Sequence, residues 1–538
     1  MNRLKNIQAI LLAIVAAALL VAAIYNVQKR LTAINEREGL TPTAKDDQRT
    51  SAIMSDSVPP VVAFTTVALG SFRGLVADWL WLRSMKMQEE GNYFEMFQLA
   101  SWIVKLQPRF TGATAFLAWN MAYNISVNFS DYEDRWRWVQ RGIELIRDEA
   151  LFYNPGDPEL FKELGWIYQH KVGQDLDDAN RYYKTQMAME LMTVLGGYPP
   201  DWVALSASPV DEKDLLRELE NPQTLQGALE ANELTFSELE KQFREDGEFP
   251  EAIGEALAEA GIRQPVALTL RHRWLLDEYK LDPQFIQALN ADYGDLDWRL
   301  PEAHAIYWAR RGREVAGEEL SISCDRMIFQ SLNHAFKRGR LIFLKDIQYL
   351  ETTPNVSLVD AVEASYQLAL DRYEGKGVKA GYENFLIDAT VILYTFGQRE
   401  KAAEYFRKGR VEYGRDKFAP NLDEFVLTQL TEDISMASYD QAQSAVQGYL
   451  FQACHSLATA QFERANTYET IARRIYLKYM KDIGDTKDRR GLPPYPQMKK
   501  NVLKRAVTSF PAGLAERLRT VVPQVEDWVL EQDQSGES

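Results

Sequence analysis

Histidine and cysteine, which often bind metals or act as nucleophiles, are few in this sequence. Among 538 residues they occur at His170, His272, His304, His334, His455, Cys324 and Cys454. No two histidines lie four positions apart, the spacing at which a zinc hydrolase binds its metal from one helix face. A phosphate-binding glycine loop and the nucleophile elbow of serine hydrolases are also missing from the sequence. The sequence therefore predicts no catalytic, cofactor-binding or metal-binding residues, and we expect no enzyme.

The residues best suited to binding a partner form two groups, and the first lies near the start of the folded body. Arg73, Asp78, Trp79 and Trp81 combine charge with large rings, and Trp and Arg are enriched at binding hot spots. Seven of the twelve tryptophans fall between Trp79 and Trp166. Rings at helical spacing fill gaps between helices, or alternatively form a platform for a peptide or a sugar. We predict that these four residues contact a partner.

The second group lies in a dense mixture of charge and rings in the middle of the chain: Asp297, Arg299, His304, Tyr307 and Trp308. Pro301-Glu302 predicts a helix start, because proline fits the first turn and an acid suits the positive end of the helix dipole. One interpretation is a buried Asp297 to Arg299 network that fixes the entry to this helix. The other interpretation is a recognition loop. On this second interpretation, we predict that these five residues contact a partner.

The first group would be positioned by a helical hairpin from Leu80 to Pro108. Apolar residues recur at helical spacing on both sides of Gly91-Asn92, which supplies the turn, and Pro108 would stop the second helix. A single hairpin cannot bury both of its apolar faces, so it needs similar hairpins stacked before and after it. We therefore expect an all-α fold in which an N-terminal transmembrane helix is followed by an α-solenoid of stacked helical hairpins.

Three segments resemble the tetratricopeptide repeat, in which small residues let two antiparallel helices approach while aromatic residues fill the gap. The matching residues are Leu80, Met87, Gly91, Ala100 and Pro108, then Phe161, Leu164, Gly165, Tyr168, Ala179 and Tyr183, and finally Leu386, Leu393, Gly397, Ala402 and Phe406. The resemblance implies a scaffold that holds a peptide or a partner protein, and it implies no catalytic residues. The stretches DWRLPEAHAIYWA, ALGSFRGLVADWLWLR and FLAWNMAYNISV also resemble membrane-anchored repeat proteins of the Planctomycetes and Verrucomicrobia branch of bacteria, which implies no activity.

The N-terminus carries an apolar run within Ile7 to Val27 that is long enough to cross a bilayer as a helix. Neither a convincing signal-peptide cleavage site nor a lipoprotein cysteine follows it, so we predict an uncleaved signal anchor. The polar residues 31–60 would lift the body off the membrane. Because a short N-terminus usually stays inside, we expect a single-pass protein of the inner (cytoplasmic) membrane with a periplasmic, or otherwise extracytoplasmic, body.

Charge is spread unevenly along the chain. The net charge of -16 and pI near 5.1 argue against a nucleic-acid binder, because phosphate binding depends on clustered Lys and Arg. Residues 211–259 hold fifteen acidic and four basic residues, a net of -11, and their capping residues and closing glycines predict short helices. Residues 473–505 are biased toward Lys and Arg. Cys324 and Cys454 predict two isolated buried thiols, with one disulfide as the alternative outside the cytoplasm.

These features divide the chain into six segments. They are a signal anchor at 1–30, a spacer at 31–60, N-terminal hairpins at 61–205, an acidic helical insertion at 206–262, middle and C-terminal hairpins at 263–480, and a basic, proline-containing stretch with a terminal amphipathic helix at 481–538. We expect a membrane-anchored scaffold or adaptor that binds a protein or peptide partner in the bacterial cell envelope, in assembly, secretion or quality control. One alternative is a carbohydrate-binding or carbohydrate-active helical protein, because paired carboxylates can be distant in sequence. The other is a structural homo-oligomer joined by its acidic and basic segments.

Overall fold

Helices make up most of the part of the chain that the structure describes. This computed structural model describes residues 73–107, 110–174, 176–344, 349–373, 376–414, 418, 421–431, 439–482 and 491–524. The predicted anchor and spacer lie outside these residues, and none of the helices inside them is long and apolar enough to span a membrane. The chain divides into two compact units, Met1–Glu163 (unit 1) and Leu164–Ser538 (unit 2).

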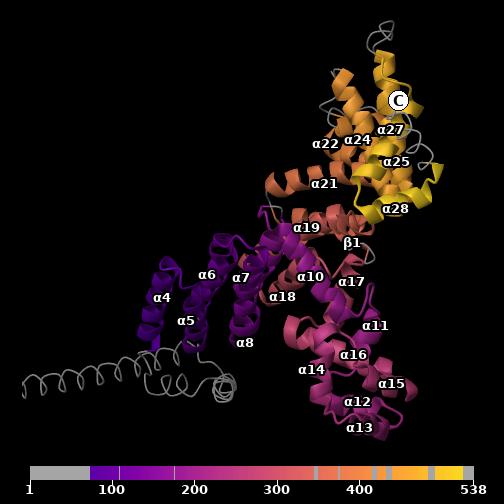
Figure 1. The fold of residues 1–538 in the computed structure, drawn as a ribbon. Helices are drawn as coiled ribbons and strands as arrows, with labels where there is room; N and C mark the ends of the chain where they lie inside the picture. The colour runs from indigo at the N-terminus through magenta and orange to yellow at the C-terminus, as the bar shows by residue number, and fades with distance from the viewer. Residues whose placement is uncertain are drawn as a thin grey trace, which may run out of the picture. The chain divides into compact units, whose positions relative to one another are not determined.

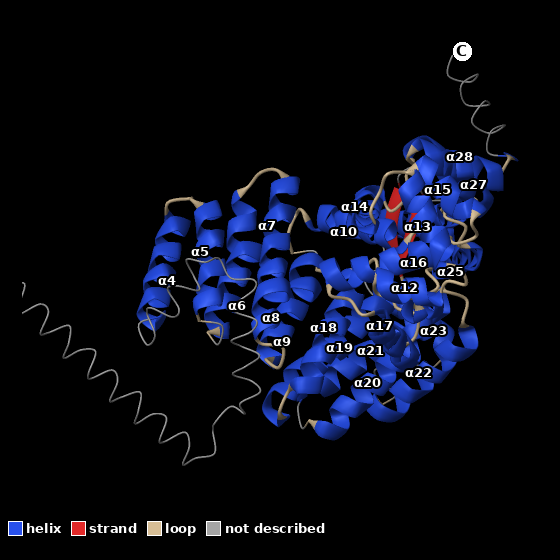
Figure 2. Ribbon diagram, turned by 90° about the horizontal axis from the view of Figure 1, so that it is seen from below, coloured by secondary structure: helices blue, strands red, loops and turns tan. Residues whose placement is uncertain are grey.

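In unit 1, helices that follow one another in the chain lie side by side (Figures 1 and 2). They are α4 (Arg73–Glu89), α5 (Tyr93–Leu106), α6 (Thr111–Asn120), the π-helical turn η2 (Met121–Ile125), the 3-10 turn η3 (Ser126–Asn128), α7 (Tyr132–Glu144), the π-helical turn η4 (Leu145–Ala150) and α8 (Leu151–Tyr153). α4 and α5 form the predicted hairpin, and Gly91 turns the chain with a φ of 74° that favours glycine. α7 begins after Asp131, whose carboxylate accepts hydrogen bonds from the backbone N–H groups of Glu133 and Asp134. The all-α, solenoid-like stacking is therefore as predicted.

Unit 2 starts within α9 (Pro158–Trp166), and short helices follow through the acidic segment. The elements are η5 (Ile167–Val172), α10 (Asn180–Leu195), α11 (Trp202–Ala207), α12 (Glu212–Glu218), α13 (Pro222–Ala231), α14 (Phe236–Asp246), α15 (Glu251–Glu259), α16 (Arg263–Trp274) and η6 (Leu275–Tyr279). α14 shows why the segment is helical: Thr235 and Glu238 form a capping box, and Gly247 ends the helix with a φ of 77°. The short helices predicted for the acidic segment are therefore confirmed. Three of them, α12, α14 and α15, pack against α16.

The middle of unit 2 pairs long helices and adds the only β-structure among the described residues. Its elements are α17 (Pro283–Tyr293), α18 (Pro301–Val315), α19 (Glu318–Arg338), β1 (Arg340–Leu344), β2 (Tyr349–Thr353), η8 (Val356–Leu358), α20 (Val359–Arg372), α21 (Lys376–Thr395), α22 (Arg399–Tyr413) and α23 (Leu422–Thr431). β1 and β2 are antiparallel, with Arg340 opposite Thr353. This hairpin was not predicted, because five-residue strands give a weak periodic signal. The α21–α22 hairpin at Gly397 is as predicted.

Gly165 shows how far apart in sequence the packed helices of unit 2 can be. An added Cβ there would lie 2.5 Å from the Sδ of Met327 and 3.3 Å from the carbonyl oxygen of Ala305. We matched Gly165 to a small position inside one repeat, but its space is taken by α18 and α19. Gly165 is therefore a position at which α18 and α19 approach the chain closely.

The last described helices share a hydrophobic core of their own within unit 2. α24 (Tyr439–Ala458), α25 (Phe462–Asp482), α27 (Tyr495–Ser509) and α28 (Ala512–Val521) share this core. Val446, Leu450, Val502 and Leu514 are among its buried side chains. The predicted segment boundary at 480 falls inside the cluster, because the basic stretch supplies an apolar helix face to the same core as α24 and α25.

Candidate functional site

The first predicted group lies on α4, and its members differ in exposure. Asp78 is exposed and Trp79 is 56% exposed, whereas Trp81 is half-buried. The side chain of Arg73 lies outside the described residues. Leu75 and Leu82, which share the Trp79 face at helical spacing, are also exposed. This face of α4 is therefore an apolar surface, and Trp81 belongs to a different face.

Trp81 begins a row of aromatic rings that crosses unit 1. Its ring centroid lies 6.4 Å from that of Phe110 and 5.5 Å from that of Phe116. Phe116 is followed by Trp119 at 6.2 Å, and Trp119 by Tyr123 at 5.4 Å. Phe110, Phe116 and Trp119 are 44%, 40% and 36% exposed. These five residues, named the aromatic row below, join α4, α6 and η2 into one partly exposed ring surface.

Neutral amides lie next to the aromatic row. The Gln88 Nε2 donates a hydrogen bond to Asn120 Oδ1 at 3.1 Å, and Asn120 Nδ2 donates to Gln88 Oε1 at 2.6 Å. Asn124, whose side chain is exposed, donates to the same Asn120 oxygen. Asn120 and Asn124 directly follow Trp119 and Tyr123 of the row in the chain, so uncharged donors and acceptors occur on the same helical segments as its rings.

The second predicted group starts with a buried ion pair, named the Asp297 corner below. Arg299 donates two hydrogen bonds to the Asp297 carboxylate, at 2.9 and 2.8 Å, and both side chains are buried. The same carboxylate accepts the backbone N–H of Leu341 at 2.9 Å, and Arg299 donates to the Leu341 carbonyl at 3.1 Å. The guanidinium carbon lies 3.8 Å from the centroid of the Tyr198 ring. Burial raises the pKa of Tyr198, and the Asp297 charge adds to this.

His304, Tyr307 and Trp308 are also buried, on the first turns of α18. His304 Nε2 lies 3.0 Å from the carbonyl oxygen of Trp298. Tyr307 donates its hydroxyl hydrogen to the Lys280 carbonyl at 3.1 Å, and burial raises the pKa of Tyr307 to about 12. The structure matches the interpretation of a buried network at the helix entry. Any surface through which a partner contacts exposed side chains must lie elsewhere.

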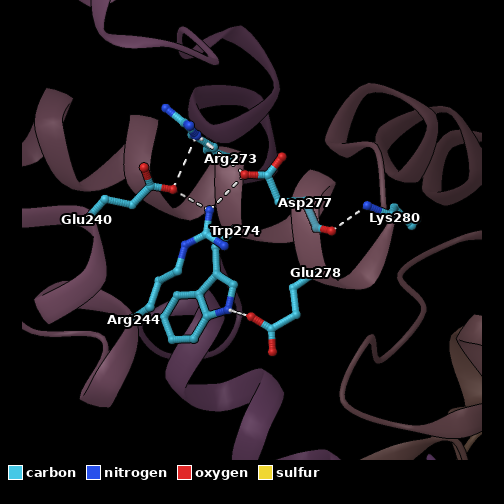
Figure 3. A network of polar contacts seen from close by, with 7 residues as sticks. All are labelled: Glu240, Arg244, Arg273, Trp274, Asp277, Glu278 and Lys280. Carbon is cyan, nitrogen blue, oxygen red and sulfur yellow. Dashed lines mark hydrogen bonds and ion pairs between the residues drawn. The ribbon is translucent and has the colours of Figure 1, made fainter. Parts of the chain in front are cut away.

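A second charged cluster joins α14, α16 and η6 (Figure 3). Arg244 donates to Asp277 at 2.9 Å and also contacts Glu240, while Arg273 lies 3.2 Å from Glu240 and 3.3 Å from Asp277. Trp274 Nε1 donates to Glu278 at 2.7 Å. Two guanidinium groups thus neutralise two carboxylates. Each carboxylate already has its cations, so we assign the cluster to fastening the acidic segment onto α16.

A pocket of about 570 Å³ in unit 2 has a different character. Its lining comes from β1, the end of β2, the α21–α22 turn, and the α24–α25 turn with the start of α25. The lining residues are Arg340, Leu341, Ile342, Thr353, Pro354, Phe396, Thr459, Ala460, Gln461, Phe462, Glu463 and Arg464. Ala460 is in the left-handed region with a φ of 60°, which is uncommon for a residue with a Cβ. Its conformation turns the chain sharply into the pocket wall.

Arg464 is held rigidly at this pocket by uncharged groups. Its guanidinium carbon lies 4.9 Å from the centroid of the Phe396 ring and 5.3 Å from that of the Tyr468 ring. Its Nη1 donates to Thr353 Oγ1 at 2.9 Å and to Gln461 Oε1 at 3.0 Å, and Nε and Nη2 donate to the Tyr468 hydroxyl. No carboxylate forms an ion pair with Arg464 within the described chain. The positive charge of this half-buried side chain is therefore not neutralised locally.

This pocket was not predicted from the sequence. Its walls come from four segments that lie far apart in the chain, so no local motif connects Arg340 to Arg464. The one available signal was Phe462-Glu463-Arg464 at the start of a helix, and such a tripeptide is common. Among the described residues, no group of three or more His, Cys, Asp or Glu is placed to hold a metal ion, and the two cysteines are buried and form no disulfide.

No protein-family model matches the sequence, and no curated protein matches it either. The described residues define the class as an all-α protein of stacked, solenoid-like helices, to which they add one small β-hairpin.

Proposed function

We propose that this chain is a membrane-anchored helical adaptor whose aromatic row binds a protein partner in the bacterial cell envelope. The observation that carries the proposal is the row itself, five neighbouring rings contributed by α4, by α6 with its N-cap residue, and by η2, three of them 36% to 44% exposed. The apolar run at 7–27 supports the membrane anchor, and the likeness of the hairpins to scaffold repeats supports the adaptor role. No catalytic residue is assigned.

The chemistry of the row favours an apolar segment of a protein as its occupant. Contiguous exposed apolar surface is unfavourable in water and marks interaction sites on soluble surfaces. Phe, Trp and Tyr offer a large contact area with few rotatable bonds, so ordering them on binding costs little entropy. The bordering amides of Gln88 and Asn124 can hydrogen-bond a partner's backbone. A partner segment with apolar side chains and no strong charge fits both features.

Site-specific photo-cross-linking tests the proposal in the native membrane. A photoreactive phenylalanine analogue replaces Phe116 in the row, and in the control it replaces Phe152, an exposed aromatic residue of α8 outside the row. We expect one discrete cross-linked protein partner from position 116 and none from position 152. The double substitution Phe116→Ser and Trp119→Ser should abolish its capture by the chain while leaving the helical content unchanged.

The other function classes give different results in the same assay. Cross-links from position 116 only to a second copy of this chain would instead support the homo-oligomer. Quenching of Trp fluorescence by glycans, removed by Trp119→Ser, would instead support a carbohydrate platform. Either result, or equal capture from positions 116 and 152, would overturn the adaptor proposal.

A further inference from the structure

We propose that the Arg464 pocket binds a small organic acid, with the carboxylate at Arg464 and Arg340 and an apolar body against Phe396 and Phe462. The site lies in unit 2 and uses no residue of the aromatic row, so it does not rest on the proposed function. The pocket volume of about 570 Å³ is in the range typical of small-molecule sites.

The first argument is the charge of the lining. Arg340 and Arg464 supply two positive charges and Glu463 one negative charge, a net of +1 in a protein whose net charge is -16. In the acidic segment, by contrast, two arginines meet two carboxylates. A ligand with a single negative charge would make the pocket neutral. A doubly charged phosphate would leave an uncompensated negative charge beside Glu463.

The second argument is the number of donors that remain. A guanidinium has five N–H groups, and the four bonds to Thr353, Gln461 and Tyr468 leave one on Nη2. The exposed Arg340 side chain forms no hydrogen bond or ion pair within the described chain. Hydrogen bonds that involve an ionised group are about twice as strong as those between neutral groups, and the planar guanidinium matches the geometry of a carboxylate. The two arginines together can therefore hold one carboxylate.

The third argument is rigidity. Thr353 donates to Gln461 Oε1 at 3.3 Å, and Gln461 Nε2 donates to Thr459 Oγ1 at 2.9 Å, so the end of β2 and the α24–α25 turn are tied to the same guanidinium. Because the cation is positioned before any ligand arrives, little ordering entropy remains to be lost on binding. Phe462, which is 55% exposed, provides the apolar wall that an acid's hydrocarbon part would cover.

Calorimetry of phenylacetate binding to the full-length chain in detergent tests this site. Phenylacetamide tests the need for charge, acetate the need for an apolar body, and inorganic phosphate the preference for a single charge. We expect phenylacetate to bind with a Kd below about 1 mM. Each of the other three probes should bind at least about tenfold more weakly. Equal binding of phenylacetamide or phosphate, or no binding of phenylacetate, would overturn the proposal.

Three variants and one control locate the binding. Arg464→Met and Arg340→Gln should weaken phenylacetate binding, the first by at least about tenfold. Glu463→Gln should strengthen it by a fewfold, because it removes a negative charge from the lining. The control is Arg410→Met, which removes a guanidinium stacked on Phe406 outside the pocket and should leave the Kd unchanged. If Arg464→Met does not fold, the opposite effects at the exposed Arg340 and Glu463 still decide the question. Unchanged Kd values in both would contradict the assignment.

Discussion

Arg299 and Arg464 lie in the same unit and contact the same β-hairpin, yet their charges are balanced differently. Both stack on aromatic rings, and they donate to Leu341 and Thr353 respectively. Arg299 is buried and has a bidentate carboxylate partner in Asp297, whereas Arg464 borders a pocket and has only neutral acceptors. A buried cation must find its counter-charge within the chain, because no solvent can replace it. A cation at a pocket can instead be solvated by water or neutralised by a charged ligand.

The largest expected effect tests the Asp297 corner. Asp297→Ala would leave the Arg299 charge buried without a partner and the Leu341 N–H without an acceptor, so it should lower the stability of unit 2 by about 3 to 5 kcal/mol. Chemical denaturation measures this loss. The double variant Asp297→Ala with Arg299→Met should recover part of it, because the uncompensated charge is gone. A double variant no more stable than the single one would show that lost packing, and not charge, dominates.

The Asp297 corner and the pocket can also be compared through one aromatic side chain at each, Trp308 and Phe462. Trp308 is buried on α18, which begins next to the Asp297 corner in the chain. Trp308→Ala should lower the free energy of unfolding by about 3 to 5 kcal/mol. Phe462→Ala at the pocket should cost less than about 1 kcal/mol, because that ring is mostly in solvent. Thermal melts of the two variants check the difference. Similar losses would mean that the pocket wall is as tightly packed as the corner.

The α18–α19 pair provides a test by pH. Burial, with Arg338, Lys337 and Lys184 nearby, lowers the pKa of His334 to about 4 from its usual 6.5. As the pH falls, the unfolded chain therefore binds this proton before the folded chain does. The stability that neutral His334 contributes is complete above pH 6.5 and is lost as the pH falls toward 4. The total loss is at most about 3 kcal/mol. His334→Gln, which can keep the hydrogen bond to Gln174, should remove this part of the slope.

A neighbouring carboxyl makes that comparison between variants necessary. Burial raises the pKa of Glu302, although Arg338 lies 3.3 Å away and acts in the opposite direction. Its folded form holds a proton that the unfolded form releases, so this group lowers stability as the pH rises above its usual range. The two slopes oppose each other in the wild type. Subtracting the pH dependence of stability of the His334→Gln variant from that of the wild type isolates the contribution of His334. Identical slopes in the two proteins would contradict a lowered pKa for His334.

A smaller effect is expected for Arg464 itself. Arg464→Met removes hydrogen bonds to neutral acceptors that water can replace, so it should cost only about 1 kcal/mol, whereas Arg299→Met should cost several times more because Asp297 stays buried. Denaturation of both variants under one condition measures the ratio. Equal losses would break the distinction between a structural arginine and one at a binding pocket.

The smallest effect concerns the turn that shapes the pocket wall. Ala460 lies in the turn that follows α24 and has a φ of 60°, and Gln461 N donates to the Ser456 carbonyl at 2.7 Å, a geometry that glycine usually supplies at helix ends. Ala460→Gly should therefore raise stability by about 0.5 to 1 kcal/mol. A small increase in melting temperature would confirm this. A decrease would show that the Ala460 methyl group packs favourably enough to offset its strain.

Much of the fold could be predicted from the sequence because its signals are local. Gly91 and Gly397 marked hairpin turns, and Thr235 marked the start of α14. The candidate sites were harder to predict. Trp79 and Trp308 are the same residue type at similar helical spacing, yet one is 56% exposed and the other 4%. Which of them is buried depends on helices that lie far away in the chain.

The sequence by itself therefore determined the helices, their ends and the apolar faces they stack, because capping, turn geometry and periodicity act within a few residues. Only the tertiary structure decided what each face meets. It brought Leu341 onto the Asp297 carboxylate, and it brought Arg340, Phe396 and Arg464 around one pocket. The physical reason is that burial and charge neutralisation are set by all the atoms packed around a group, whatever their distance along the chain.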